Sequence, residues 1–388
     1  MTKIGELIKG TSGTDIMIGI QRPGELDIID VTLTREKIKT PDVPYYGMIS
    51  DSTGYLTLSK FTRTATIEVR KALIQLTDSL GAKQIVFDLR GNGGGLLREA
   101  VNIVNLFVPK GQEVVSMKGK TPEWNNNYST QNKALLPEIP LAILIDNKSA
   151  SASEIVAGTL QDLDRAIIVG QESFGKGLVQ QTKKLAYGSR IKITVAKYYT
   201  ASGRCVQRLH YGDRDDLGDA KIQEDSTLQT FYTKNGRPVI EGRGVIPDID
   251  IETIKLNYVI NGILNSGIIF DFAIYQPKDL VEEPKDFKLS ESSWNEFVEF
   301  TVQAFENEKR DLPYEASSSS LVDELGKSLQ NDGLYEGYGD LLDSLEELTK
   351  ADMRVDLERN RKLITLNIEE ELIFHSANKT GVFEYLLT

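Results

Sequence analysis

The chain has 388 residues, of which 40% are hydrophobic, and this is enough to form two or three domains with buried cores. Its net charge of -12 excludes the concentrated basic surface of a nucleic-acid-binding protein, so we predict no nucleic-acid partner. The single cysteine, Cys205, excludes an internal disulfide and a zinc site built from several cysteines.

The first 24 residues predict one short helix and one strand. Ile4, Leu7 and Ile8 form the apolar side of a helical turn, and the stretch DIMIGIQRPG (15–24) is typical of a strand. The apolar core of a secretory signal is absent. Because one helix and one strand cannot form a domain alone, we expect an N-terminal portion, with any export signal, to be missing from this chain.

Strands and helices alternate over the next part of the sequence. In chain order we predict a helix at 64–80 that stops at Gly81, a strand at 84–88, a glycine-rich turn at 90–95, a helix from Leu97, a strand at 141–146, a helix over Ile155, Val156 and Leu160, a strand at 166–170 and a half-exposed strand at 190–199. This alternation predicts an α/β fold with a mostly parallel sheet and covering helices. Active groups are then expected where strands lead into helix N-termini.

The texture of the sequence changes after residue 276. The stretch QPKDLVEEPKD is polar and contains proline, as linkers do, and the remainder reads as acidic amphipathic helices. We therefore predict a separate helical C-terminal region.

A run of small residues and serines, SASAS (149–153), opens one of the predicted helices. A serine hydroxyl becomes a nucleophile only when a neighbouring base takes its proton. The two histidines, His210 and His375, are interpreted as surface or packing residues. A lysine can serve instead if its amine is neutral, which apolar burial favours, and Lys176 lies between Phe174 and Leu178 in SFGKGLV.

Neighbouring residues are consistent with this chemistry. A helix N-terminus favours developing negative charge, and the glycine-rich turn offers bare N–H groups for an oxyanion hole. If the lysine segment continues as a strand, Lys176, Leu178 and Gln180 share a face, and the Gln180 amide could orient the amine.

Each feature also has a structural interpretation. A serine here can be a helix cap and a lysine can be solvated, while Asp88 and Arg90 can bind each other or backbone groups at the strand end. The glycine turn does not fit a dinucleotide site, because that motif requires glycine where Leu96 stands.

Three linked motifs, DLRGNGGG, SASASEIVAG and SFGKGLVQQ, occur in this order and resemble the C-terminal processing peptidases, also called tail-specific proteases. The likeness extends to GYLTLSKF (54–61), YYTASGRCVQ and GRGVIPDIDI, and it covers roughly residues 15–255. It implies a crotonase-like core preceded by a PDZ domain. On this basis residues 1–23 are expected to be the last helix and strand of a PDZ domain, 24–275 the serine peptidase core and 276–388 the helical C-terminal region.

The resemblance assigns a role to individual residues. The middle serine of the run, Ser151, matches the nucleophile, and Lys176 matches the base. Gln180 matches the glutamine that orients the lysine. The backbone N–H groups of Ala152 and Gly95 match the oxyanion hole, with Gly94 as the alternative to Gly95. The resemblance implies no metal and no organic cofactor.

The implied activity is that of a serine endopeptidase with a Ser-Lys dyad. Its partners would be polypeptide substrates with unstructured, apolar C-termini, and its location the periplasm or cell envelope of a bacterium. The oligomeric state is left open. The alternative is a catalytically idle peptide-binding or scaffolding relative, and a nucleotide-binding α/β protein is disfavoured by the failed glycine motif and the acidic charge.

Overall fold

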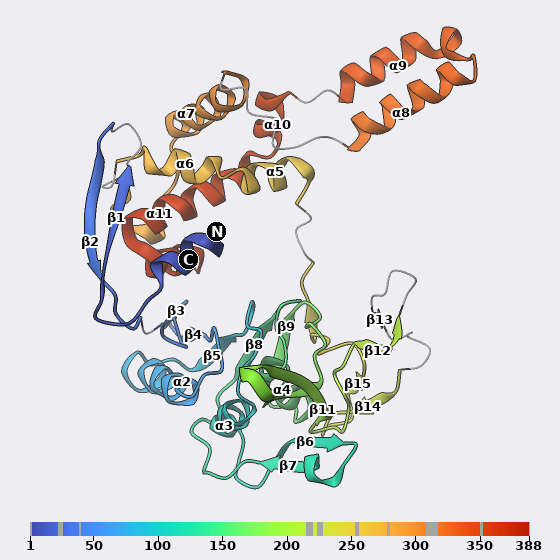
Figure 1. Cartoon of the computed structure of the whole chain (residues 1–388). Helices are drawn as coiled ribbons and strands as arrows, with labels where there is room; N and C mark the ends of the chain where they lie inside the picture. Colours follow the sequence, from blue (N-terminus) through green and yellow to red (C-terminus); the bar gives the residue numbers. More distant parts are fainter. Residues whose placement is uncertain are drawn as a thin grey trace. The chain divides into compact units, whose positions relative to one another are not determined.

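A computed structural model describes residues 2–21, 26–38, 40–214, 220–222, 228–252, 256–277, 280–307, 317–349 and 352–387. The chain divides into two compact units (Figure 1). One unit is Lys39–Thr253, and the other combines Met1–Ile38 with Ile254–Thr388. The expected peptidase core, residues 24–275, contains the whole of the first unit.

A six-stranded sheet forms the centre of the Lys39–Thr253 unit. Its order is β16-β9-β8-β5-β4-β3, and all neighbours are parallel except β3 and β4. The strands are β3 (Tyr45–Met48), β4 (Thr53–Thr57), β5 (Gln84–Asp88), β8 (Leu141–Ile145), β9 (Ile167–Gly170) and β16 (Ile249–Asp250). The predicted mostly parallel α/β sheet is thus confirmed, whereas the likeness to the crotonase fold stays a prediction.

Three helices pack beside this sheet, and α3 lies between α2 and α4 (Figure 1). They are α2 (Ala65–Ile74), which continues into the π-helical turn η1 (Gln75–Ser79), α3 (Leu97–Phe107) and α4 (Ala152–Asp162). Gly81, the predicted helix stop, has φ +78°, a conformation that side chains with a Cβ disfavour. Apolar residues of the helices and strands form one continuous core.

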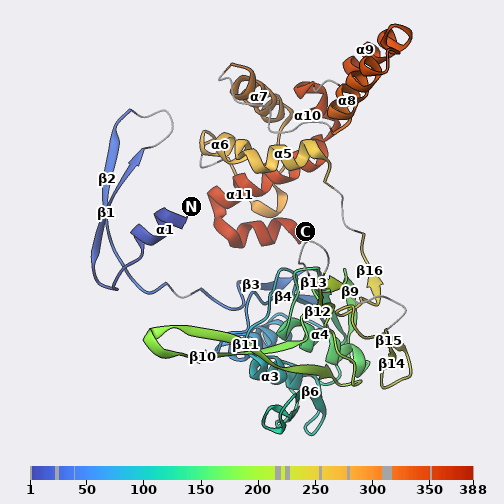
Figure 2. The same ribbon diagram turned by 45° about the vertical axis from the view of Figure 1, so that its right-hand side comes forward.

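A second, antiparallel sheet has the order β10-β11-β6-β7 (Figure 2 shows β10 and β11 side by side as a long ribbon). Its strands are β6 (Glu113–Gly119), β7 (Asn126–Ser129), β10 (Leu178–Lys184) and β11 (Arg190–Thr200). Helix α4 contacts β9 of the first sheet and β6 and β11 of the second, and every residue of α4 is buried. A helix enclosed in this way is a rigid support for residues at its two ends.

Short elements complete this unit. They are the 3-10 turns η2 (Pro122–Trp124) and η3 (Ala186–Gly188), the hairpin of β12 (Leu209–Arg214) and β13 (Ala220–Ile222), and the hairpin of β14 (Thr230–Tyr232) and β15 (Pro238–Ile240).

The second unit begins with α1 (Thr2–Ile8) and a hairpin of β1 (Asp15–Gln21) and β2 (Ile28–Thr34). The helix and strand predicted near the N-terminus are therefore present, and their assignment to a PDZ domain stays a prediction. The remaining elements are helical. Two of them, α5 (Tyr258–Ser266) and α6 (Ile268–Ile274), lie before residue 276, in the range expected for the peptidase core. The region predicted to be helical, after residue 276, contains η5 (Pro284–Asp286), α7 (Glu291–Val302), η6 (Gln303–Asn307), α8 (Ser317–Asn331), α9 (Tyr335–Thr349), α10 (Met353–Arg359) and α11 (Arg361–Leu386). Among the helices of the described residues, none is long and apolar enough to cross a membrane.

Candidate active site

Two loops meet at the carboxyl ends of β5 and β8. Because these strands are parallel neighbours, the segments that follow them start at the same edge of the sheet. The Ala150 N–H donates to the Asn92 carbonyl at 3.0 Å, which joins the serine run to the glycine-rich turn. A Cβ added to Gly94, whose φ is +94°, would lie 2.5 Å from the Ala150 carbonyl oxygen. The close approach of the two loops therefore requires a glycine at this position.

The three serines of the run have different surroundings. Ser149 donates its hydroxyl to the Leu89 carbonyl at 2.8 Å, and Ser153 donates to the Asn92 carbonyl at 2.8 Å. Both serines are fully buried. Ser151 is half-buried and lines a cavity. Two of the three hydroxyls thus fasten the glycine-rich turn, and Ser151 alone of the three contributes to the cavity wall.

Ser151 has an unusual backbone. It stands immediately before α4 with φ 58° and ψ -110°, a region that non-glycine residues rarely occupy. Such strain persists only where the surroundings hold it, and it is common at functional sites. The Ser151 N–H donates to a carboxylate oxygen of Glu154 at 2.7 Å, which is one of the contacts that maintain this geometry.

The cavity beside Ser151 has a volume of about 540 Å³. Besides the five residues expected in a catalytic centre, namely Gly95, Ser151, Ala152, Lys176 and Gln180, its wall contains Leu96, Leu97, Arg98, Met117, Tyr128, Ile155, Leu178, Val179, Gln181, Lys192 and Tyr198. The fold thus brings together the five expected residues, which are up to 85 positions apart in the sequence, from Gly95 to Gln180. Neither histidine lines the cavity.

Backbone N–H groups are available beside Ser151. Ala152 is the first residue of α4, so its N–H has no acceptor within the helix. Within the described part of the chain, the N–H groups of Ala152 and Gly95 have no hydrogen-bond acceptor. The Gly94 N–H donates to the Asn92 side chain at 2.8 Å. Of the two glycines considered for the oxyanion hole, Gly95 is the one with a free donor.

Lys176 lies just before β10, and its side chain is half-buried. Of its two apolar neighbours in the sequence, Phe174 is 47% exposed and Leu178 is half-buried. Since β10 begins at Leu178 and its register shifts between Val179 and Gln180, the shared-face argument does not extend to Lys176. Gln180 is exposed, and within the described residues no hydrogen bond joins it to Lys176. The orienting role of Gln180 stays a prediction.

Glu154 is a residue of the site that the sequence analysis missed. Its fully buried carboxylate accepts hydrogen bonds from the Ser151 N–H at 2.7 Å, the Ser173 hydroxyl at 2.6 Å, the Gly175 N–H at 2.7 Å and the Lys176 N–H at 2.9 Å. Burial raises the pKa of the Glu154 carboxyl, and the four donors oppose this shift because they favour the charged form. One side chain therefore holds the backbones of both Ser151 and Lys176.

Tyr198 supports the lysine from the other side. Its buried hydroxyl donates to the Lys176 carbonyl oxygen. Burial, and then the charge of Glu154, keeps the pKa of the Tyr198 phenol well above its ordinary value. A signal for Tyr198 was available, since it lies within the YYTASGRCVQ segment, but no local pattern shows which of its residues faces the lysine.

Asp88 and Arg90 bind each other, and Asp88 also accepts from a backbone N–H, as the structural interpretation of this pair expects. The Arg90 guanidinium lies 2.6 Å from the Asp88 carboxylate, and the Arg90 N–H donates to the same carboxylate at 2.8 Å. The buried Tyr55 hydroxyl also donates to Asp88, at 2.7 Å. These contacts fix the end of β5, from which the glycine-rich turn departs.

The described residues do not meet the requirements of a metal site. Among these residues, no group of three or more histidine, cysteine, aspartate or glutamate side chains is arranged to hold a metal ion.

The α/β fold, with a strained serine before a buried helix and a lysine in the same cavity, is compatible with the class of serine-type hydrolases. Comparison with known proteins gives the family: residues 52–212 match peptidase family S41, and residues 259–388 match the C-terminal helical domain of probable PDZ-proteases. Residues 52–212, which make up most of the Lys39–Thr253 unit, thus belong to peptidase family S41.

Its relatives include proteases of bacteria. A probable CtpA-like serine protease of Staphylococcus aureus is 32% identical over 317 residues, which are 76% of this chain and 58% of the relative. A carboxy-terminal-processing protease of Bartonella bacilliformis is 38% identical over 205 residues, 52% of this chain and 46% of the relative. The chain thus spans about half the length of these relatives. The solved photosystem II D1 C-terminal processing protease is 25% identical, with coverage of 64% of this chain and 58% of that chain and a TM-score of 0.43.

Proposed function

We propose that this chain is a serine endopeptidase that cleaves polypeptides near unstructured, apolar C-termini, in the cell envelope of a bacterium. The observation that carries the proposal is the shared cavity, in which Ser151 and Lys176 both line the wall while the hydroxyls of Ser149 and Ser153 are committed to backbone carbonyls. The match of residues 52–212 to peptidase family S41 supports the same activity.

The proposed reaction proceeds through an acyl-enzyme. The neutral Lys176 amine accepts the proton of the Ser151 hydroxyl while the serine oxygen bonds to the peptide carbonyl carbon. The N–H groups of Ala152 and Gly95 donate to the resulting oxyanion. Lys176 then gives the proton to the leaving amine as the C–N bond breaks. A water molecule hydrolyses the ester with the same lysine as base, and Gln180 orients the amine.

Peptide cleavage by the full-length protein tests this proposal. The substrate is an unfolded polypeptide with an apolar tail, and the rate is measured from pH 6 to 10 for the wild type, Ser151→Ala and Lys176→Ala. We expect both variants to lose cleavage and the wild-type rate to rise with pH, as is general for a reaction whose base must be deprotonated. If Ser151→Ala cleaves as fast as the wild type, the proposal is wrong. A wild type that binds the polypeptide without cleaving it would identify an idle peptide-binding relative.

A further inference from the structure

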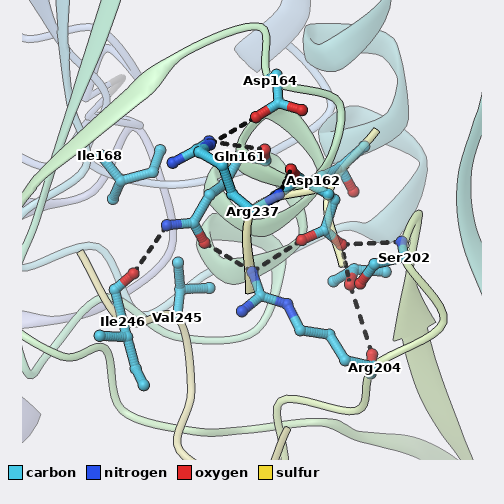
Figure 3. Close-up of polar contacts among 12 residues, drawn as sticks. Gln161, Asp162, Asp164, Ile168, Ser202, Arg204, Arg237, Val245 and Ile246 are labelled. Atoms are coloured by element: carbon cyan, nitrogen blue, oxygen red, sulfur yellow. Dashed lines mark hydrogen bonds and ion pairs between the residues drawn. The ribbon is translucent and has the colours of Figure 1, made fainter. Parts of the chain in front are cut away.

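A buried ion pair lies at the end of α4 opposite Ser151. Asp162, the last residue of α4, lies 2.9 Å from the guanidinium of Arg204, and the two side chains are 0% and 1% exposed (Figure 3). Arg204 also donates to the Gln161 side chain at 2.7 Å. The other Asp162 oxygen accepts the Thr200 hydroxyl at 2.5 Å and the Ser202 N–H at 3.0 Å. The turn after β11 is thus held against the end of α4.

Stability alone explains this pair poorly. Two charges that leave water lose solvation that their mutual attraction often fails to restore, so an apolar pair of similar size is commonly as stable. The Arg204 Nε–H also has no acceptor among the described residues, which adds to the cost. Arg204 does supply a directional link through its hydrogen bond to the Gln161 side chain, whereas its contact with the Asp162 carboxylate is an ion pair without hydrogen-bond geometry.

Residues 205–208, which follow Arg204, hydrogen-bond to residues 175–177, which contain Lys176 and are called the lysine loop below. The Arg208 N–H donates to the Gly175 carbonyl at 3.0 Å, and the Gly177 N–H donates to the Gln207 side chain at 2.8 Å. These two glycines flank Lys176 on either side. A Cβ on Gly175 would lie 2.4 Å from the Arg208 Cβ. The lysine loop is therefore packed closely against residues 205–208.

Residues 205–208 are themselves enclosed. On their other side, the Gly242 N–H donates to the Cys205 carbonyl at 2.9 Å and the Gly244 N–H donates to the Val206 carbonyl at 3.1 Å. Gln207 is 4% exposed, and its amide N–H donates to the Leu209 carbonyl at 2.9 Å, which orients the oxygen that Gly177 uses. Because residues 205–208 are held on both sides, we expect a displacement of the Arg204 side chain to shift the backbone of these residues.

These contacts link the two ends of α4 to the two groups of the proposed dyad. Ser151 precedes the first residue of the helix, and Asp162 ends it, roughly 16 Å away at about 1.5 Å per residue. We propose that Arg204 is a positioning residue: through its ion pair with Asp162 and its hydrogen bond to Gln161 it fixes the position of residues 205–208, and these hold Lys176 at its working distance from Ser151. This inference rests on the proposed function of Ser151 and Lys176.

Two variants and a matched control test the inference in the full-length protein. Arg204→Lys keeps the positive charge but shortens the link, and Gln207→Met removes the acceptor of the Gly177 N–H while the ion pair stays. Thr159→Val is the control, because its buried hydroxyl lies on the same helix and donates to the Val114 carbonyl at 2.8 Å, away from the lysine loop. We measure kcat and KM for an apolar-tailed peptide, together with the melting temperature.

We expect Arg204→Lys and Gln207→Met each to lower kcat by on the order of ten- to a hundredfold with KM changed less than about threefold, since small misplacement of a reacting group costs rate rather than binding. The double variant should lose much less than the product of the two factors, because both act through one segment. Thr159→Val should lower the melting temperature and leave kcat within about twofold.

The opposite results overturn the inference. If Arg204→Lys and Gln207→Met lower the melting temperature as Thr159→Val does and leave kcat unchanged, the pair is only structural. If Arg204→Lys fails to fold, Gln207→Met decides alone: normal kcat contradicts positioning. A wild type that does not cleave the peptide removes the proposed function and this inference with it, whereas a cleaving wild type with fully active variants removes only the inference.

Discussion

Replacing Glu154 with glutamine changes the charge and one atom of a group that holds both halves of the proposed dyad. One carboxylate oxygen accepts from the Ser173 hydroxyl and the Gly175 N–H, and the other accepts from the Ser151 and Lys176 N–H groups. An amide has one oxygen. If the NH₂ group faces Ser173 and Gly175, the Ser173 hydroxyl can rotate and accept from it, and one donor–donor contact remains, with the Gly175 N–H. In the opposite orientation the NH₂ group meets the N–H groups of Ser151 and Lys176, and two hydrogen bonds are lost.

The expected cost follows from this count. A hydrogen bond to a charged group contributes about 1.5 to 3 kcal/mol, so the less costly orientation, which loses one bond, is expected to cost about 1.5 to 3 kcal/mol. Glu154 is fully buried, and solvent does not screen the loss. Either the unfolding free energy falls by that amount, or the loops of Ser151 and Lys176 move apart to avoid the contacts. In the second case we expect kcat/KM to fall on the order of a hundredfold.

Glu68→Gln is a matched control for this substitution. Glu68 is half-buried, and one of its oxygens accepts both the Asp42 N–H at 2.7 Å and the Val43 N–H at 3.0 Å. An amide can keep its oxygen at that position, so this variant should lose about 1 kcal/mol or less. Urea unfolding and peptide cleavage are measured for both variants. If Glu154→Gln matches the wild type in both assays, the assignment of Glu154 as the link between the two loops is wrong.

Three further variants test the site. Gly94 has φ +94°, and a Cβ at this residue would lie 2.5 Å from the Ala150 carbonyl oxygen, so Gly94→Ala should lower kcat/KM at least tenfold. A Cβ on Gly93 would have no atom within 4 Å, so Gly93→Ala should cleave the peptide at the wild-type rate. Ser149→Ala should lower the unfolding free energy by about 1 to 3 kcal/mol and keep most of the activity; loss of all activity would argue against Ser151 as sole nucleophile. Burial raises the pKa of the Tyr198 phenol, so the contribution of this phenol to the unfolding free energy is full below about pH 10 and falls above it. The unfolding free energy of Tyr198→Phe should therefore increase relative to that of the wild type as the pH rises beyond about 10. A difference between the two proteins that does not change with pH would contradict this.

Local patterns predict the parts of this fold that depend on nearest neighbours. The strand predicted at 84–88 matches β5 residue for residue, and those at 141–146 and 166–170 differ from β8 and β9 by one residue each. Short apolar runs between turn residues suffice to predict these strands. The helix predicted at 64–80 is present too, and its stop at Gly81 follows from a backbone conformation that glycine alone adopts at no cost.

Contacts made across long sequence separations are not predictable in this way. Glu154 lies in a helix of small and apolar residues, and three of its four donors come from positions 173 to 176, about 20 residues further on. A glutamate at this place reads locally as a good residue for the first turn of a helix. Its burial, which makes it part of the site, depends on the second sheet covering α4. The union of residues 1–38 with 254–388 in one unit is long-range in the same sense.

The serine run illustrates how a repetitive motif can encode different tasks. In SASAS the hydroxyls of Ser149 and Ser153 point toward the glycine-rich turn and donate to the carbonyls of Leu89 and Asn92. The small alanine side chains between the serines allow the two loops to pack closely. The backbone of Ser151 must then adopt a positive φ to enter α4, and this places its side chain in the cavity wall. A cap alone would require one serine with ordinary dihedral angles. Three serines, of which two are bonded to the neighbouring loop and the middle one is strained, are better explained by a site that must present one hydroxyl in a fixed direction.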